Sequence, residues 1–459
     1  MLHIFKQIFG IKTSEHPSAI PSSHSLSSHS LSTRGIIAAK TQLRVDWEIF
    51  SEASQNIYDK KDNPDGAFTL NVAENRLSWY LLKEKIEEVV SQHSIPSWVP
   101  LYTSCLGAPS FRKVLAGFLA KFVTKCDISP DHIAVSAGAS SVIELTSWLV
   151  TEKGDVAVFP APSYSVYKQD INNKSGLERY DLITHSELSE IAEKPIMNIP
   201  LLENALSDIT SQGKRFRMLV LTTPDNPTGG MYDMDTLTNV ADWCIDHHIH
   251  LIVNEIYALS LINTKHPDIA TDYSHHQDFE SFALVMEQKK SDYLHMWYAL
   301  SKDLGTSGFR VGLLYTHNED LLQAYDNFNV PHLVSNFTQW VFEVVLSDHA
   351  FMECYIKKNQ EHLTESYIVV INKLKKLNIP YAPSRGSLFV WLDLSRFLLS
   401  QTQEAETNFW EKLYRESGVL LTPGNGFGHS KRGMFRLVYP CHTKEELVVA
   451  MDRMERCLF

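Results

Sequence analysis

The chain has 459 residues, of which 44% are apolar and 21% charged, and its formal net charge is −12. This length is enough for two or three domains with a large core. Acidic and basic residues are interspersed, which argues against nucleic acid as a partner. No apolar run approaches the roughly 18 residues that a membrane-spanning helix needs. Six scattered cysteines without CxxC spacing predict reduced thiols in a cytoplasmic protein, not disulfides or a metal site.

The first 40 residues are expected to form a disordered or loosely attached tail. Residues 17–33 are rich in serine, histidine and proline, and such a composition cannot bury enough apolar surface to hold one structure. Apolar residues between positions 2 and 11 are compatible with a short amphipathic helix, although a frayed terminus is the simpler interpretation.

From about residue 100, short β-rich runs alternate with longer helical patterns. We expect strands at residues 133–136, 156–160, 218–222, 250–253, 294–298 and 311–315, and helices at 140–150 and 234–246. The run 250–253 is nearly all apolar, which is typical of a strand buried on both faces. This alternation predicts an α/β fold, with a mostly parallel sheet sandwiched by helices. Ligands of such sheets bind beyond the carboxyl ends of the strands.

The C-terminal part of the chain has a different pattern. It predicts a long helical stretch over roughly residues 336–377, strands at 388–392 and 435–439, and a closing helix from Lys444. These elements indicate a smaller α+β domain. The expected division is therefore the tail (1–40), an N-terminal arm with part of the small domain (41–100), a large domain (101–335) and a C-terminal small domain (336–459).

The segment 298–312 (YALSKDLGTSGFRVG) is the most informative in the chain. Lys302 lies beside small residues, and Arg310 follows eight positions later. A primary amine can form a Schiff base with an aldehyde, and a guanidinium can hold a phosphate with two hydrogen bonds. The segment resembles the cofactor-lysine motif of fold-type I pyridoxal 5'-phosphate (PLP) enzymes, in the class I aminotransferase branch. The resemblance implies PLP as cofactor, Lys302 as a catalytic residue, and Ser301 and Arg310 as cofactor-binding residues.

Two strand ends resemble further motifs of that family. Residues 225–229 (DNPTG) are similar to its NPTG turn, and residues 253–258 (VNEIYA) to its DEIY strand end. The resemblance implies that Asn226 and Tyr257 donate to the phenolic oxygen of PLP, with Tyr257 also catalytic. Asn254 stands where the family has an aspartate that keeps the pyridine nitrogen protonated. Because an amide offers no charge, we expect a weaker electron sink here.

A turn before a helix matches the phosphate site of the family. Residues 136–140 (SAGAS) are small, and backbone N–H groups at a helix N-terminus suit an anion. The resemblance assigns Ala139 and Ser140 to the cofactor phosphate. Ala299 stands where the family commonly has a serine three residues before the lysine, so one hydroxyl is missing from the expected phosphate site.

Two more segments supply contacts to the ring and to the substrate. Residues 160–164 (PAPSY) resemble the loop that lays an aromatic side chain over the pyridine, which here is Tyr164. Residues 433–437 (GMFRL) resemble the segment whose arginine clamps the α-carboxylate of the substrate. A guanidinium suits that task because it can donate two parallel hydrogen bonds, so Arg436 is the predicted clamp.

The N-terminal motifs narrow the resemblance. Residues 63–66 (NPDG) and 73–78 (AENRLS) look like the NPxG…AENQLS segment of 1-aminocyclopropane-1-carboxylate (ACC) synthases and ACC-synthase-like proteins. The glutamate at the position of Glu74 helps those synthases recognise S-adenosylmethionine, a cationic substrate. Cys105 stands where they have a tyrosine near the cofactor. The resemblance instead assigns Tyr102 to the cofactor phosphate of a neighbouring subunit, so a homodimer is expected.

These motifs follow the family's order and predict a PLP enzyme that acts on an α-amino acid. Elimination of the ACC-synthase type and transamination both stay open, because Asn254, Ala299 and Cys105 depart from the family pattern. A second hypothesis is a catalytically weakened protein of this fold with a binding or regulatory role. The expected partners are a small amino-acid substrate and a second copy of the chain, without nucleic acid, membrane or metal.

Overall fold

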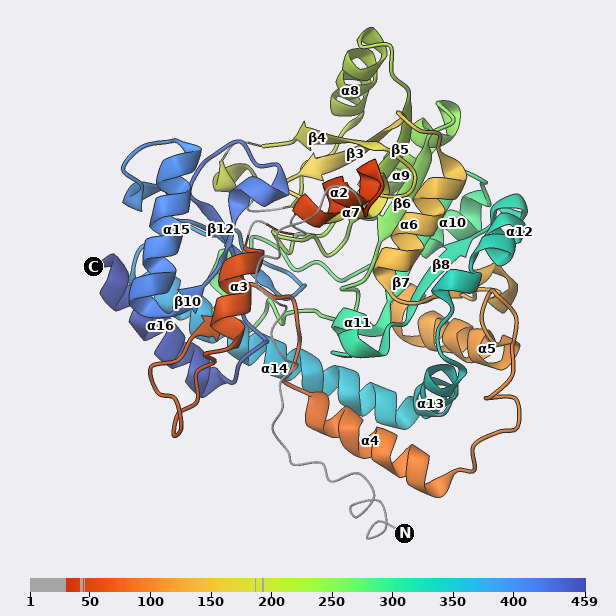
Figure 1. Ribbon diagram of the computed structural model, residues 1–459, viewed down its shortest axis with the longest axis horizontal. Helices are drawn as coiled ribbons and strands as arrows, with labels where there is room; N and C mark the ends of the chain where they lie inside the picture. The colour runs from red at the N-terminus through yellow and green to blue at the C-terminus, as the bar shows by residue number, and fades with distance from the viewer. Residues whose placement is uncertain (1–29, 42–43, 45, 186, 192–193) are drawn as a thin grey trace.

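A seven-stranded sheet forms the centre of the larger part of the molecule (Figure 1). This computed structural model describes residues 30–41, 44, 46–185, 187–191 and 194–459. The strands are Ile133–Ser136 (β2), Val156–Ala161 (β3), Glu178–Ile183 (β4), Phe216–Thr222 (β5), His250–Asn254 (β6), Leu294–Ala299 (β7) and Gly312–Thr316 (β8). Their order is β2-β8-β7-β6-β5-β3-β4. β8 runs antiparallel to both neighbours and the other pairings are parallel, so the predicted mostly parallel sheet is confirmed.

Helices cover both faces of this sheet, as the strand–helix alternation predicts. Successive side chains of a strand point to opposite faces, so Val220 and Leu221 of β5 belong to two separate apolar clusters. The cluster with Val220 includes the helices Ala139–Val150 (α6), Tyr167–Asn172 (α7) and Glu319–Phe328 (α12). The cluster with Leu221 includes Pro109–Phe118 (α5), Ile199–Ser211 (α8), Met234–Asp246 (α9), Ala283–Lys289 (α10) and Asn336–Ser347 (α13).

The smaller part of the molecule is α+β, also as predicted. Its strands are Phe389–Asp393 (β9), Thr422–Pro423 (β11) and Met434–Val438 (β12), in the antiparallel order β11-β12-β9. Phe68–Thr69 (β1) pairs with Val419–Leu420 (β10) beside them. Side chains from Trp47–Ser54 (α3), Gln403–Ser417 (α15) and Lys444–Leu458 (α16) share one apolar core with these strands. Segments from both ends of the chain therefore build this part, while the proposed domain limits stay a prediction.

The long helical stretch expected over roughly residues 336–377 is confirmed, but the chain divides it into two helices. α13 ends at Ser347, and α14 (His349–Lys376) begins after Asp348. The Asp348 carboxylate accepts a hydrogen bond from the N–H of Phe351 at 3.0 Å and lies 2.9 Å from Lys85 Nζ on α4 (Trp79–Gln92). An N-cap aspartate satisfies the first N–H groups of the new helix. Apolar periodicity on both sides of Asp348 concealed this break.

The expected N-terminal tail is described only from residue 30. Thr33–Lys40 forms a short helix, α2, that has no buried residue. The expectations for residues 1–29, including the amphipathic helix near the start, lie outside the described residues. Within the described chain, no helix combines the length and apolar character that crossing a membrane requires.

Candidate active site

A pocket opens at the sheet edge where the parallel strands end. The parallel strands β3, β5, β6 and β7 end at this edge. β8 begins there, because it is antiparallel to β7. β2 is also antiparallel to β8, so β2 ends at the same edge. Loops from separate motifs therefore meet. Every predicted site residue except Tyr102 lines the pocket, namely Glu74, Ala139, Ser140, Tyr164, Asn226, Asn254, Tyr257, Ser301, Lys302, Arg310 and Arg436.

Lys302 lies on α11 (Leu300–Asp303), the short helix that follows β7. Its Nζ donates to the carbonyl of Ala73 at 2.6 Å. Burial, together with nearby arginines and against the opposing charge of Glu74, lowers the pKa of the Lys302 amine from 10.5 to about 8. The neighbouring Asp303 fixes the helix, because its carboxylate accepts from the hydroxyls of Tyr298 at 2.9 Å and Ser260 at 2.7 Å. The fold thus holds a readily neutralised amine at the pocket wall.

The start of α6 and Arg310 form a site suited to an anion. The N-cap residue Gly138 has φ +87° and provides no side-chain cap to the helix. A Cβ at Gly138 would lie 2.4 Å from Arg310 Nη2, so glycine permits this close approach. Arg310 donates to the neutral carbonyl of Ser307 at 3.0 Å. Helix N–H groups and a guanidinium without a carboxylate on these contacts together favour phosphate.

Arg436, on β12, is a buried cation with neutral partners. Its side chain donates to the Asn226 amide oxygen at 3.0 Å and to the carbonyl of Asn71 at 2.9 Å. Its guanidinium carbon lies 4.5 Å and 5.1 Å from the ring centroids of Phe389 and Phe427. Arg436 is 3% exposed, its Nε has no hydrogen-bond partner among the described residues, and burial lowers its pKa to about 10. A buried cation in such a setting favours an anionic ligand.

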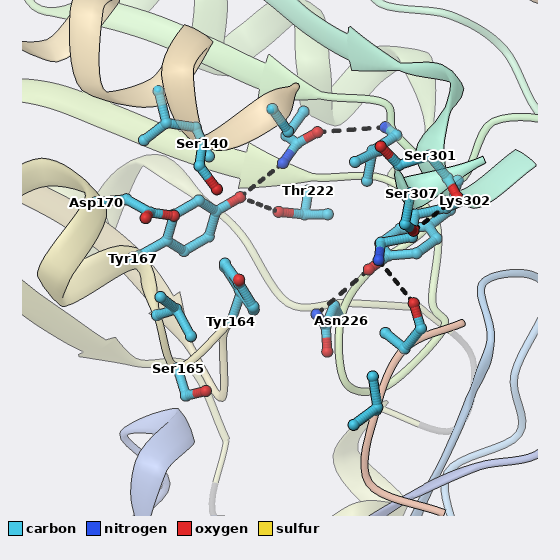
Figure 2. Close-up of a pocket in the computed structure, with 18 of the residues that line it drawn as sticks. Ser140, Tyr164, Ser165, Tyr167, Asp170, Thr222, Asn226, Ser301, Lys302 and Ser307 are labelled. Atoms are coloured by element: carbon cyan, nitrogen blue, oxygen red, sulfur yellow. Dashed lines mark hydrogen bonds between the residues drawn. The ribbon is translucent and has the colours of Figure 1, made fainter. Parts of the chain in front are cut away.

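Aromatic and amide side chains line the space between Lys302 and α7 (Figure 2). Asn226 Nδ2 lies 3.5 Å from the hydroxyl of Tyr257, which is a long hydrogen bond. Tyr164 meets the ring of Tyr167 edge to face, with centroids 5.2 Å apart. Burial raises the pKa of both Tyr164 and Tyr257, so both phenols are neutral donors at ordinary pH.

Asn254 is tied into a chain of neutral hydrogen bonds that sequence reasoning missed. Its Nδ2 donates to the hydroxyl of Tyr167 at 2.8 Å, and its Oδ1 accepts from the N–H of Ile256 at 3.2 Å. The Tyr167 hydroxyl also bonds the hydroxyl of Thr222 at 3.1 Å. The available signal was spacing, because Tyr167 follows Tyr164 by three residues and begins α7. Its contact with β6, however, depends on how α7 packs.

Asp170 is a second lining residue that the sequence did not single out. It lies one turn after Tyr167 on α7. Burial raises the pKa of its carboxyl to about 7, with Glu144 contributing in the same direction. Its Oδ2 has no hydrogen-bond partner among the described residues. The Asp170 carboxyl, on the α7 side of the pocket, is therefore partly protonated near neutral pH.

Of the three residues connected with the ACC-synthase resemblance, Glu74 lines the pocket, whereas Tyr102 and Cys105 do not. Glu74 lines the pocket, and its Oε2 accepts from Arg76 Nη2 at 2.6 Å and Nε at 3.0 Å. Tyr102 is 97% exposed and lies outside the pocket of its own chain. Cys105 is half-buried and does not line the pocket, and burial raises the pKa of its thiol.

Comparison with known sequences decides the family. The profile of "Aminotransferase class I and II" matches residues 69–454. The chain belongs to this family. It is 28% identical to 1-aminocyclopropane-1-carboxylate synthase 7 of Arabidopsis thaliana over 425 residues, covering 89% of this chain and 90% of the relative. It is 30% identical to 1-aminocyclopropane-1-carboxylate synthase 5 of rice (Oryza sativa subsp. japonica), covering 89% of this chain and 76% of the relative.

Solved structures share the fold of this family member. The Thermus thermophilus aspartate aminotransferase with maleate has a TM-score of 0.75 at 19% identity, covering 93% of this chain and 99% of that one. An archaeal alanine:glyoxylate aminotransferase also has a TM-score of 0.75 at 19% identity, covering 93% and 98%. The predicted fold type, a large α/β part with a smaller α+β part, is therefore confirmed.

Proposed function

We propose that this family member is a PLP-dependent enzyme that acts on an α-amino acid. The observation that carries the proposal is that Lys302, with its pKa lowered to about 8, shares one pocket with the buried Arg436, which donates to neutral groups. A neutral amine can capture an aldehyde and can accept a proton. A guanidinium with an unpartnered N–H can bind a carboxylate.

The pocket fits the chemistry of PLP. The close approach of Arg310 to Gly138 and the uncapped start of α6 suit its phosphate. Bound PLP would supply an electron-withdrawing ring that stabilises negative charge at the α-carbon of the substrate. The residues that would hold it are Lys302 at the aldehyde, Asn226 and Tyr257 at the phenolic oxygen, Tyr164 at the ring face, Asn254 at the ring nitrogen, and Ala139, Ser140, Ser301 and Arg310 at the phosphate.

Each of these side chains has a defined task in the proposed reaction. Arg436 binds the α-carboxylate and so orients the α-carbon. Lys302 accepts the α-proton on Nζ, and its lowered pKa keeps part of the amine neutral for this step near neutral pH. Tyr257 and Asn226 donate hydrogen bonds, since burial keeps the Tyr257 phenol protonated by raising its pKa.

The subsequent step is elimination of the ACC-synthase type or transamination. Similarity to the two plant synthases favours elimination from S-adenosylmethionine. The ion pair of Glu74 with Arg76 weakens this specific assignment, because a neutralised carboxylate attracts a cationic substrate less. An amino acid without a distal positive charge is therefore the substrate class that we test first.

The test is a spectral titration of the PLP-loaded protein. We expect the visible absorbance of purified protein to change on addition of some α-amino acids, and S-adenosylmethionine serves as the comparison substrate. The matching decarboxylated amines are the control, because they lack the group that Arg436 would bind. The proposal is wrong if no PLP is retained, or if amines and amino acids act alike.

A catalytically weakened protein with a binding or regulatory role is the second candidate. The observation in its favour is Asn254, an amide within a neutral hydrogen-bond network at the position of the family aspartate. It predicts that amino acids change the absorbance of the bound cofactor while no product accumulates. Product analysis over many equivalents of substrate separates the two candidates.

A homodimer completes the proposal. Tyr102 is 97% exposed and away from the pocket of its own chain, which fits a contact with the phosphate of a second copy. Light scattering at micromolar concentration is expected to give twice the mass of the chain. A monomer that retains PLP would contradict this assignment.

A further inference from the structure

The hydrogen bonds of Asn254 support an inference that rests on the proposed binding of PLP. We propose that this chain holds the ring nitrogen of PLP unprotonated, with Asn254 as its neutral partner and Tyr167 as the residue that positions Asn254. The pyridine ring of PLP would then be neutral in this protein, whereas the family aspartate keeps it protonated. The orientation of one amide and the charges around it support this inference.

The orientation of the Asn254 amide is set by the backbone. The N–H of Ile256 can only donate, so the Asn254 atom 3.2 Å away must be the oxygen. The nitrogen then faces the Tyr167 hydroxyl at 2.8 Å, which accepts one of its two hydrogens. The second hydrogen can serve an acceptor, and an unprotonated pyridine nitrogen is an acceptor whereas a protonated one is a donor.

The partners of this amide carry no charge at neutral pH. Burial raises the pKa of Tyr167 to about 12, so its phenol stays neutral. Tyr167 shares its remaining hydrogen bond with the hydroxyl of Thr222 at 3.1 Å (Figure 2). A protonated pyridine needs a negative partner to hold its proton above its ordinary pKa. The chain Asn254–Tyr167–Thr222 offers none.

Cationic side chains that line the pocket also disfavour a protonated ring nitrogen. Arg436, Arg310 and Arg44 each lower the pKa of Lys302, whereas Glu74 raises it, and all of these side chains line one pocket. Arg44 is paired with Asp46, so Arg436 and Arg310 are the cations whose described contacts are to neutral groups. The same positive charges oppose a further proton on a cofactor ring bound among them. The charges of Arg436 and Arg310 thus agree with the local hydrogen bonds.

The carboxyl groups around the pocket do not replace the family aspartate. Glu74 is paired with Arg76 at 2.6 Å. Asp225 accepts from the Thr228 hydroxyl at 2.7 Å, and burial raises its pKa to about 6. Asp170, whose pKa is raised to about 7, is the competing source of charge, but the Tyr167 hydroxyl points away from it and toward Thr222 (Figure 2).

The test is solid-state NMR of the full chain reconstituted with PLP that carries ¹⁵N in its ring. The chemical shift of this nitrogen separates protonated from unprotonated rings without any turnover. We expect the wild-type resonance to match an unprotonated reference compound throughout the neutral pH range. In Asn254→Asp, whose carboxylate can still accept from Ile256, we expect the resonance to move to the protonated position.

Two further results complete the test. Asp170→Asn should leave the wild-type resonance unchanged, and a change would show that Asp170 sets the protonation and would overturn the inference. A protonated ring in the wild type would overturn it as well, even if Lys302 holds the cofactor as proposed. Loss of the labelled PLP on desalting would instead overturn the proposed function, and this inference with it.

Discussion

The two ends of the pocket differ in the charge of their side chains. At one end, Arg436 is a buried cation that donates to neutral groups. At the other end, Asn254, Tyr167 and Thr222 are neutral and satisfy one another. Burying a cation with neutral partners is costly, whereas a closed network of neutral groups is not. The first end is therefore suited to an anionic ligand and the second to a neutral one.

The largest predicted effect concerns the amine at the cationic end. Lowering the pKa of Lys302 from 10.5 to about 8 increases the neutral fraction of the amine at neutral pH by roughly 300-fold. The rate at which the PLP-free protein captures PLP covalently should therefore rise with pH, reach half its maximum near pH 8, the folded pKa, and level off above it. Stopped-flow absorbance measures this rate.

Lys302→Arg is the matched control, because it keeps the charge and should remove the capture. A rate in the wild type that continues to rise steeply toward the ordinary lysine pKa of 10.5 would mean that burial does not activate this amine.

The second prediction removes the clamp. Arg436→Leu should weaken amino-acid binding about a hundredfold, because a charge-assisted contact is worth about 3 kcal/mol. Retained PLP should change little, since the phosphate site lies at Arg310 and α6. Spectral titration gives both quantities.

Arg34→Leu, on the exposed helix α2, is the control for loss of an arginine that does not line the pocket. If the titration of Arg436→Leu coincided with that of Arg34→Leu and of the wild type, the carboxylate site would have to lie elsewhere.

The third prediction concerns a variant that places a charge at the neutral end of the pocket. Asn254→Asp should accelerate exchange of the α-proton with deuterated solvent about tenfold, which corresponds to about 1.4 kcal/mol of barrier. The reason is that a carboxylate favours a protonated ring, which withdraws more charge from the α-carbon. Mass spectrometry of recovered substrate measures the exchange.

Asn254→Ala serves as the comparison, because it removes the amide without adding charge. Equal exchange in the wild type and Asn254→Asp would show that the charge at this strand end does not limit the chemistry.

The smallest predicted effect concerns the Glu74–Arg76 pair. Arg76→Gln should improve binding of S-adenosylmethionine by about threefold, because releasing one exposed ion pair is worth less than about 1 kcal/mol. The two side chains are 39% and 60% exposed, so solvent screens much of their interaction. Binding of an uncharged amino acid should stay as in the wild type, and a parallel change for both ligands would exclude an electrostatic origin.

Much of the site could be predicted from the sequence because its residues follow strands. Asn226, Asn254 and Lys302 come shortly after or at the ends of buried apolar runs, and parallel strands bring such ends together. The links that depend on side-chain packing could not be predicted. Tyr167 reaches Asn254 only through the placement of α7.

Other parts of the fold escaped prediction for similar reasons. The break at Asp348 depends on one cap hydrogen bond within an otherwise periodic stretch. The pairing of Glu74 with Arg76 depends on side-chain conformations within a loop. Local sequence patterns predict which segments form strands and helices. These side-chain contacts, however, depend on the folded geometry.

The most direct test of the account is to find which lysine holds PLP. The purified protein would be reduced with borohydride, digested and mapped by mass spectrometry. We expect a pyridoxyl group on Lys302, and none on Lys214, which is half-buried and paired with Glu178 at 2.7 Å. A pyridoxyl group on a different lysine, or none on protein that retains PLP, would contradict it.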